Sequence, residues 1–221
     1  MSRINVIDVF SGAGGLSQGF ANAGFNIVAG IDNDAESLIT FSKNHSKATT
    51  INFDLSQKID FSSNEFSSIN NVKIDIVIGG PPCQGFSVAG KRHELDPRNS
   101  LYKTYVSFIK KFAPKIMVME NVPTIMSMYD GRVYENIVSE LESLGYTTSS
   151  FILDSSHYGI PQKRKRFFLV GTKNGKKIYP PEPIEDIKLT VKDAISDLPS
   201  LENKDESKMY LSQPKNKYQK K

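Results

Sequence analysis

The chain has 221 residues, of which 38% are hydrophobic and 10% aromatic, a composition typical of a globular domain. No stretch approaches the roughly 18 apolar residues of a membrane span, and no signal peptide is visible, so we expect a cytoplasmic protein. A single cysteine excludes an internal disulfide, and with only three histidines it argues against a metal site. The net charge of +4 and the isoelectric point of about 9.0 are compatible with a polyanionic partner without requiring one.

Short β-rich runs alternate with helical patterns in chain order. The expected strands cover residues 4–10, 25–31, 49–53, 74–78, 115–120, 147–154 and 166–171. The expected helices cover residues 16–23, 35–44, 101–112 and 133–144. This βαβα order predicts an α/β fold with a mostly parallel sheet. The loop between the last two strands is too short for a parallel crossover, so we expect them to pair antiparallel at the edge of the sheet.

The character of the sequence changes after about residue 172. Three prolines interrupt the chain at Pro180, Pro181 and Pro183, one modest helix is expected at residues 189–198, and residues 215–221 are rich in lysine. We therefore expect one α/β domain over residues 1–172 and an extension over residues 173–221.

A Gly-rich turn at residues 11–15 separates the first expected strand from the first helix. Its spacing differs from G-x-G-x-x-G because position 17 is serine, and alone it is equally typical of a structural turn. Asp32 closes the second strand, where a carboxylate can accept hydrogen bonds from ribose hydroxyls. Asp54 follows the third strand and could hold an adenine amino group. Either aspartate alone could be a helix N-cap, but three such features at successive strand ends favour an adenosine-containing cofactor.

Cys83 follows the fourth expected strand directly after Pro81 and Pro82. An isolated cysteine is more often a buried small hydrophobe, but the rigid prolines would present this one at the carboxyl end of the sheet. A thiolate that adds to C6 of cytosine makes C5 able to attack the methyl group of a sulfonium donor. Amine methyltransferases need no such adduct and resemble this region with an aromatic residue after the prolines. Cys83 therefore indicates methylation of carbon.

Acidic and basic side chains follow in the second half of the chain. Glu120 closes the fifth strand, so we expect it to face the same crevice as Cys83, where a carboxyl group can bond the N3 and N4 edge of cytosine and deliver a proton to N3. The alternative is a solvent-exposed glutamate. A basic run at residues 163–166 is usually a solvated face or a phosphate-contacting patch. Strand geometry would place Arg164 and Arg166 on one side, where they could contact the base O2 and orient Glu120.

Three runs in this order resemble the DNA cytosine-C5 methyltransferase family: Pro-Pro-Cys-Gln at residues 81–84, Glu-Asn-Val at 120–122 and Gln-x-Arg-x-Arg at 162–166. The resemblance covers residues 4 to about 172 and implies a Rossmann-like S-adenosylmethionine-dependent methyltransferase fold with an antiparallel edge strand. It also implies methyl transfer from S-adenosylmethionine to C5 of a flipped cytosine in double-stranded DNA, with S-adenosylhomocysteine as product. The setting that it suggests is restriction-modification.

The resemblance also implies roles for particular residues. Catalysis is expected from Cys83, Glu120, Arg164 and Arg166. Cofactor contacts are expected at Phe10, Ser11, Gly12, Gly14, Leu16, Asp32, Asn33, Asp54, Leu55, Pro82 and Leu101. DNA contacts are expected at Gln84, Ser87, Lys91, Arg92, Arg98, Lys163 and Lys165, with residues 84–98 closing over the DNA.

The chain departs from the family at its end. Residues 190–201 resemble the segment that precedes the target-recognition region, but that region and the closing motif are not matched. We therefore expect a second polypeptide that carries the recognition region, unless the sequence is truncated. Two alternatives remain open, a tRNA cytosine-C5 methyltransferase with a similar core and a non-catalytic remnant that binds the cofactor or DNA.

Overall fold

The computed structural model describes residues 3–82, 101–184, 189–198 and 213–220. The chain forms two compact units. The first contains Met1–Phe151 and Phe167–Tyr179, and the second contains Ile152–Arg166 and Pro180–Lys221. Among the described residues, no helix is long and apolar enough to cross a membrane.

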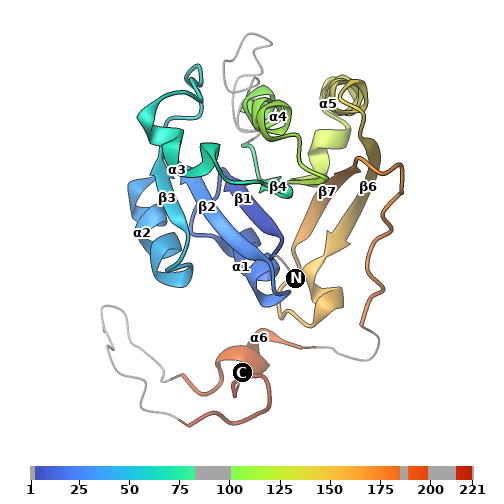
Figure 1. Ribbon diagram of the computed structural model, residues 1–221. Coiled ribbons are helices and arrows are strands. Elements are labelled where there is room, and N and C mark those ends of the chain that lie inside the picture. Colours follow the sequence, from blue (N-terminus) through green and yellow to red (C-terminus); the bar gives the residue numbers. More distant parts are fainter. Residues whose placement is uncertain (1–2, 83–100, 185–188, 199–212, 221) are drawn as a thin grey trace. The chain divides into compact units, whose positions relative to one another are not determined.

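A seven-stranded sheet has the strand order β3-β2-β1-β4-β5-β7-β6 (Figure 1). The strands are β1 (Asn5–Val9), β2 (Asn26–Asp32), β3 (Thr49–Asn52), β4 (Ile76–Gly79), β5 (Ile116–Asn121), β6 (Thr147–Asp154) and β7 (Lys165–Thr172). The first five strands pair in parallel, whereas β7 pairs antiparallel with β5, so that Glu120 lies opposite Phe168. The mostly parallel α/β fold with antiparallel pairing near one edge is confirmed.

The helices occur in the expected order along the chain. They are α1 (Gly15–Asn22), α2 (Ala35–Asn44), α3 (Ser67–Asn70), α4 (Leu101–Phe112), α5 (Arg132–Ser143) and α6 (Val191–Ile195). Short 3-10 turns occur at η1 (Asn64–Phe66), η4 (Pro123–Met126) and η5 (Ser155–Tyr158). The sequence patterns predict the longer helices to within one or two residues, but not η1 or α3.

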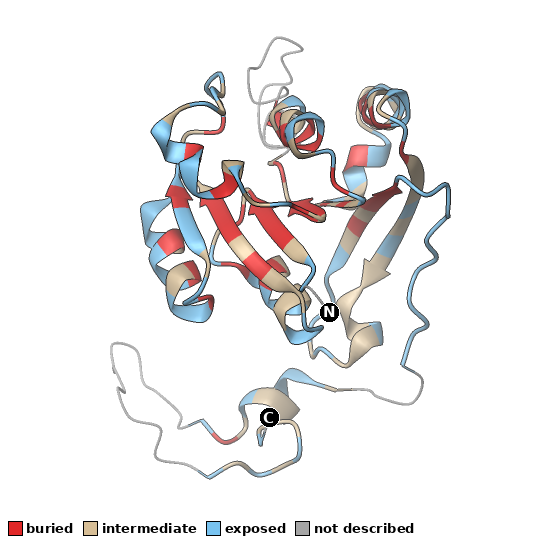
Figure 2. Ribbon diagram, viewed as in Figure 1, coloured by how far each residue is buried: buried red, intermediate tan, exposed pale blue. Residues whose placement is uncertain are grey.

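Helices cover both faces of the sheet in the first unit, so the central strands are buried on both sides (Figures 1 and 2). Ile7 and Val9 of β1 pack in a cluster with residues of α4 and α5, while Val6 packs in a second cluster with residues of α1 and α2. This alternation follows from the two-residue period of a strand. Burial on both faces explains why β4 reads as a continuous apolar run rather than as an alternating pattern, and why residues 6–9 of β1 are all buried.

The strand order indicates where a ligand is expected to bind, at the switch point beside β1. β1 pairs with both β2 and β4. β2 and β3 therefore extend the sheet on one side of β1, and the later strands extend it on the other side. In open α/β sheets, ligands bind at the carboxyl ends of the strands beside such a switch point. The turns after β1, β2, β3, β4 and β5 all lie at these ends.

Gly79 permits the close approach of β4 to β1 at this point. A Cβ atom there would overlap the Val9 carbonyl oxygen and lie 2.9 Å from the Tyr105 ring. We expect Gly79→Ala to lower the free energy of unfolding by about 2 kcal/mol, the usual cost of overpacking a core. Chemical denaturation measures this loss. Gly19→Ala is the matched control, because a Cβ there meets nothing within 4 Å and the helix should gain stability.

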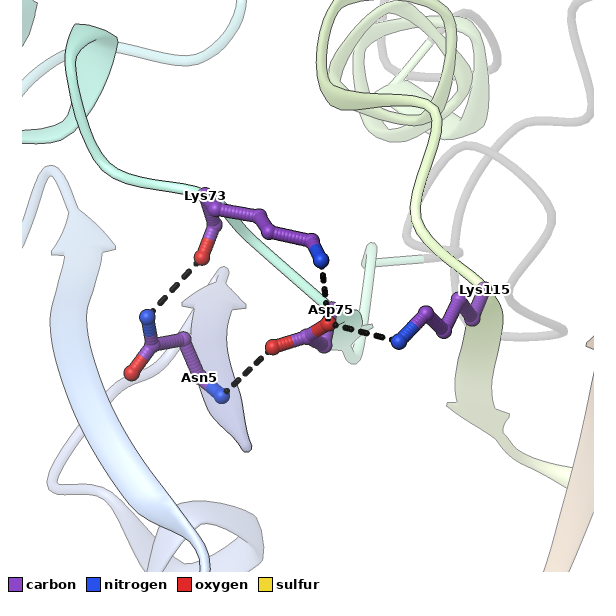
Figure 3. A network of polar contacts seen from close by, with 4 residues as sticks. All are labelled: Asn5, Lys73, Asp75 and Lys115. Carbon is purple, nitrogen blue, oxygen red and sulfur yellow. Dashed lines mark hydrogen bonds and ion pairs between the residues drawn. The ribbon is translucent and has the colours of Figure 1, made fainter. Parts of the chain in front are cut away.

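A polar network ties β1, β4 and β5 together at the opposite, amino-terminal end of the strands (Figure 3). The Asp75 carboxylate accepts the Asn5 N–H at 3.2 Å and pairs with Lys115 at 3.2 Å, and the Asn5 side chain donates to the Lys73 carbonyl at 2.9 Å. Partial burial opposes ionisation of Asp75, but these donors hold its pKa below the usual value. Both lysines are largely exposed, so their pairing adds little stability. The network is therefore structural.

Candidate active site

Several residues of the Gly-rich turn that follows β1 have a left-handed backbone conformation. The N–H groups of Phe10 and Ser11 both donate to the Ile31 carbonyl of β2, at 2.9 and 3.1 Å. Phe10 has φ 65°, Gly12 φ 50° and Gly14 φ 86°. Such angles strain residues that carry a Cβ atom, so glycine suits Gly12 and Gly14, whereas Phe10 is held there by its bond to β2. The turn then opens α1.

Asp32 contacts the Gly-rich turn directly. One carboxylate oxygen accepts the Gly12 N–H at 2.8 Å, and the other accepts the Asp34 N–H at 3.0 Å. Each carboxylate oxygen can accept more than one hydrogen bond, so Asp32 can hold the turn and still accept ribose hydroxyls. The neighbouring Asn33 is exposed. The structure thus brings together Gly12 and Asp32, which the sequence suggests separately.

The segment after β3 is joined to the same edge. The Phe53 N–H donates to the Asp32 carbonyl at 2.9 Å. Hydrogen bonds from the Ser56 hydroxyl and N–H lower the pKa of Asp54, which keeps this carboxyl ionised. Leu55 is buried, and its carbonyl accepts the Thr104 hydroxyl of α4 at 3.0 Å. Leu101, which begins α4, is also buried.

The segment after β4 lies against the end of β5. The Asn121 side chain is buried and donates to the Pro81 carbonyl at 2.9 Å, while its oxygen accepts the Val122 N–H at 2.8 Å. A Cβ atom at Gly80 would lie 3.2 Å from a carboxylate oxygen of Glu120. The Glu120 carboxylate therefore lies beside the backbone that leads through Pro82 into Cys83.

Six predicted site residues lie outside the described residues. They are Cys83, Gln84, Ser87, Lys91, Arg92 and Arg98. The predicted cofactor contacts, including the half-buried Phe10 and Leu16, all lie among the described residues of the first unit.

The basic run lies in the second unit. The Ser155 N–H donates to the Arg164 carbonyl at 3.0 Å, and the Arg166 guanidinium donates to the Lys165 carbonyl at 2.8 Å. Lys163, Arg164 and Lys165 are exposed, whereas Arg166 is half-buried. Glu120 belongs to the first unit, so the contact of the two arginines with Glu120 stays a prediction.

Sequence reasoning missed a buried acid beneath the Gly-rich turn. Asp8 in β1 is 1% exposed, and the Ser17 hydroxyl of α1 donates to its carboxylate at 2.6 Å. Burial, opposed by the Ser17 hydrogen bonds, raises the pKa of Asp8 to about 7. The signal in the sequence is an acidic residue flanked by the apolar residues Val6, Ile7 and Val9 of the same strand. Asn121 belongs to the Glu-Asn-Val run at residues 120–122, but its hydrogen bond to the Pro81 carbonyl is seen only in the structure.

Asp8 makes stability depend on pH. Its pKa is higher in the folded chain than the usual 3.8, so the folded state binds the proton more tightly. The free energy of unfolding of the wild type should therefore fall by up to about 1.4 kcal/mol per pH unit as the pH rises toward 7. Asp8→Asn can still accept from Ser17 but cannot ionise, so it should lose much of this slope. Denaturation at pH 5 and pH 8 tests this, and equal slopes for the two proteins would contradict it.

Among the described residues, no group of three or more His, Cys, Asp or Glu side chains is arranged to hold a metal ion. The site consists of turns that expose backbone groups, the carboxylates of Asp32 and Asp54 at two strand ends, and the Glu120 carboxylate beside Gly80.

Comparisons with known proteins agree with this arrangement. The model of the family described as C-5 cytosine-specific DNA methylase matches residues 4–221. The Type II methyltransferase M.AgeI of Thalassovita gelatinovora is 36% identical over 98% of this chain and 57% of its own length. The Type II methyltransferase M.AquIA of a Picosynechococcus strain is 35% identical over 88% of each chain.

A solved structure supports the same relationship. A protein described as a DNA modification methyltransferase encoded within a prophage of E. coli matches with a TM-score of 0.74 and 32% sequence identity. The match covers 90% of this chain and 56% of that one, so this chain spans little more than half the length of M.AgeI and of the prophage protein. By the family match and the M.AquIA similarity, the chain belongs to the C-5 cytosine-specific DNA methylase family.

Proposed function

We propose that this chain is the catalytic part of a DNA cytosine-C5 methyltransferase that acts on double-stranded DNA. One observation carries the proposal: the Glu120 carboxylate lies beside Gly80, and Asn121 holds Pro81, so β5 supports the segment that leads into Cys83. A carboxyl group and a thiol on adjacent strand ends are the two groups that activation of cytosine requires. We also propose a cytoplasmic location, because the protein must have access to its DNA substrate.

The residues present fit S-adenosylmethionine. Open space surrounds the positions where Gly12 and Gly15 would carry a Cβ atom, so a ligand can approach this backbone closely. Asp32 and the ionised Asp54 provide acceptors for ribose and adenine groups at the two neighbouring strand ends. When bound, S-adenosylmethionine supplies an electrophilic methyl group and leaves as S-adenosylhomocysteine. No metal is needed for this reaction.

The chain's own residues would then activate the base. The Cys83 thiolate adds to C6 of the cytosine, and a proton delivered by Glu120 to N3 accepts the displaced electron pair. C5 would then take the methyl group that the cofactor supplies. The C5 proton would pass to water, and elimination would restore the Cys83 thiolate as N3 returns its proton to Glu120. Such an attack requires a base that has been flipped out of the stack. Arg164 and Arg166 are proposed to bind the base and orient Glu120, and Lys163 and Lys165 to contact phosphates.

The recognition part is proposed to reside on a second polypeptide. M.AquIA supports this, because its whole length is close to that of this chain and it is named a methyltransferase. Without the recognition region, the basic residues would give only sequence-independent phosphate contacts that weaken with salt. The 221-residue chain alone should therefore bind DNA without sequence preference, and sequence-specific methylation should appear only with the partner. Robust sequence-specific methylation by the chain alone would contradict this.

Incorporation of a tritiated methyl group tests the substrate class. The chain, alone and co-expressed with the product of the adjacent gene, is given unmethylated duplex DNA or tRNA, and the product base is identified by chromatography. We expect 5-methylcytosine in DNA, within a restriction-modification system as the names of the relatives suggest. Label in tRNA alone would favour the RNA-directed alternative. Binding without transfer to either would favour a non-catalytic remnant.

A further inference from the structure

A buried histidine, His45, contacts the Gly-rich turn from α2. It directly follows the last residue of α2 and is 7% exposed. Its Nε2 lies 3.3 Å from the Gly14 carbonyl oxygen. A carbonyl oxygen only accepts hydrogen bonds, so this contact requires the proton of the ring to lie on Nε2. None of the roles proposed above uses this side chain.

The His45 ring has little freedom to move. Its backbone N–H donates to the Phe41 carbonyl at 2.8 Å, and its own carbonyl accepts the Ala48 N–H at 2.8 Å. The ring packs on Phe41 with a distance of 4.6 Å between ring centroids. Backbone and side chain are thus both fixed, which suits a group that holds another segment in place.

Phe41 and His45 together fill the space against two segments of the proposed cofactor site. A Cβ atom at Gly14 would lie 2.7 Å from the Phe41 ring and 2.8 Å from His45 Nε2. A Cβ atom at Gly30, in the strand that ends at Asp32, would overlap the Phe41 ring. The end of α2 therefore packs directly on both the Gly-rich turn and β2.

The Gly14 carbonyl has two hydrogen-bond donors. It accepts the Gln18 N–H at 2.8 Å, which begins the hydrogen bonding of α1, and it accepts His45 Nε2. Gly14 is the N-cap of α1 and has no side chain that could cap it. Two donors fix the plane of the peptide between Gly14 and Gly15. In a trans peptide the N–H of Gly15 points away from that carbonyl, and Gly15 is exposed in open space.

We propose that His45 is a positioning residue for the cofactor. It holds the Gly14 carbonyl and thereby fixes the first turn of α1, whose N–H groups can receive an anionic group such as the carboxylate of S-adenosylmethionine. The inference rests on the proposed cofactor site. It adds a residue on α2 that the sequence motifs do not point to, and it makes the donor on Nε2, rather than the bulk of the ring, the functional feature.

Two variants separate the donor from the ring. His45→Phe keeps a ring against Phe41 but cannot donate, whereas His45→Gln places an amide donor near the position of Nε2. Leu38→Ala is the control for α2, because Leu38 is buried in this helix and its side chain cannot donate a hydrogen bond to the Gly14 carbonyl. The measurement is NMR of the complete chain, which reports the His45 tautomer, amide exchange in the first turn of α1, and weak binding during titration with S-adenosylmethionine.

We expect the Nε2-protonated tautomer in the wild type. His45→Phe should bind S-adenosylmethionine about tenfold more weakly and exchange the first-turn amides of α1 faster, while its melting temperature should fall less than that of Leu38→Ala. His45→Gln should recover most of the affinity. Leu38→Ala should lower the melting temperature and leave the affinity within about twofold. The tenfold loss expected for His45→Phe corresponds to about 1.4 kcal/mol, as expected for one hydrogen bond at the site.

The results that would overturn the role of His45 can be distinguished from failure of the proposed function. An Nδ1-protonated tautomer, unchanged amide exchange in His45→Phe, or equal weakening by Leu38→Ala would overturn the role of His45. If the wild type does not bind S-adenosylmethionine even at millimolar concentration, the cofactor proposal fails and the role of His45 in cofactor binding falls with it. The tautomer and exchange data would then show whether His45 still holds the turn.

Discussion

Cys83→Ser is expected to reduce methyl transfer to DNA by at least a hundredfold, which corresponds to about 2.7 kcal/mol of activation free energy. The serine hydroxyl is nearly the same size, but its alkoxide is far less available near neutral pH than a cysteine thiolate. The chain has a single cysteine, so no second thiol can substitute. Initial rates of tritiated methyl incorporation, measured with the recognition partner present, check this.

The affinity for S-adenosylmethionine is the control for Cys83→Ser. It should stay within about twofold of wild type, because the proposed cofactor contacts are made by other residues. Retention of more than about a tenth of the wild-type rate, a loss of only about 1.4 kcal/mol, would contradict the assignment of Cys83 as nucleophile.

Glu120→Gln is expected to lower the turnover number by about a hundredfold or more, the usual range for loss of a positioned general acid. Glutamine fits the space beside Gly80 and can still hydrogen-bond the base, but it cannot deliver a proton to N3. DNA binding should therefore change less than turnover. Single-turnover kinetics with saturating DNA and cofactor separates the two effects.

Glu140→Gln is the matched control, because the same chemical change there affects a surface ion pair with Lys110 and not the proposed site. Pairs of this kind contribute little, so both activity and stability should stay close to wild type. If Glu120→Gln were as active as Glu140→Gln, Glu120 would be a structural residue at the end of β5.

The order of strands and helices could be predicted because it depends on local periodicity. The apolar run of β4 and the amphipathic pattern of α4 each indicate burial against neighbouring layers. The position of β7 between β5 and β6 could not be predicted, because pairing between distant segments leaves no local pattern. The short elements η1 and α3 were missed because four or fewer residues carry too little periodicity.

Part of the candidate site could likewise be predicted from the sequence, whereas other contacts are seen only in the fold. Gly12, Asp32 and Glu120 can be picked out in the sequence because each lies at or directly after the end of an expected strand. The contact of the Gly12 N–H with Asp32 depends on the pairing of β1 with β2 and is seen only in the fold. Asp8 and His45 are buried polar residues whose hydrogen-bond partners, Ser17 and Gly14, are distant in the sequence, so their contacts are seen only in the fold.

Covalent trapping tests the central claim most directly. DNA with 5-fluorocytosine at the target position is incubated with S-adenosylmethionine, the chain and its recognition partner. Fluorine at C5 cannot leave as a proton does, so the adduct should survive denaturation, and peptide mapping should place it at Cys83. Turnover on ordinary DNA without a trapped adduct, or an adduct at another residue, would contradict the proposed function.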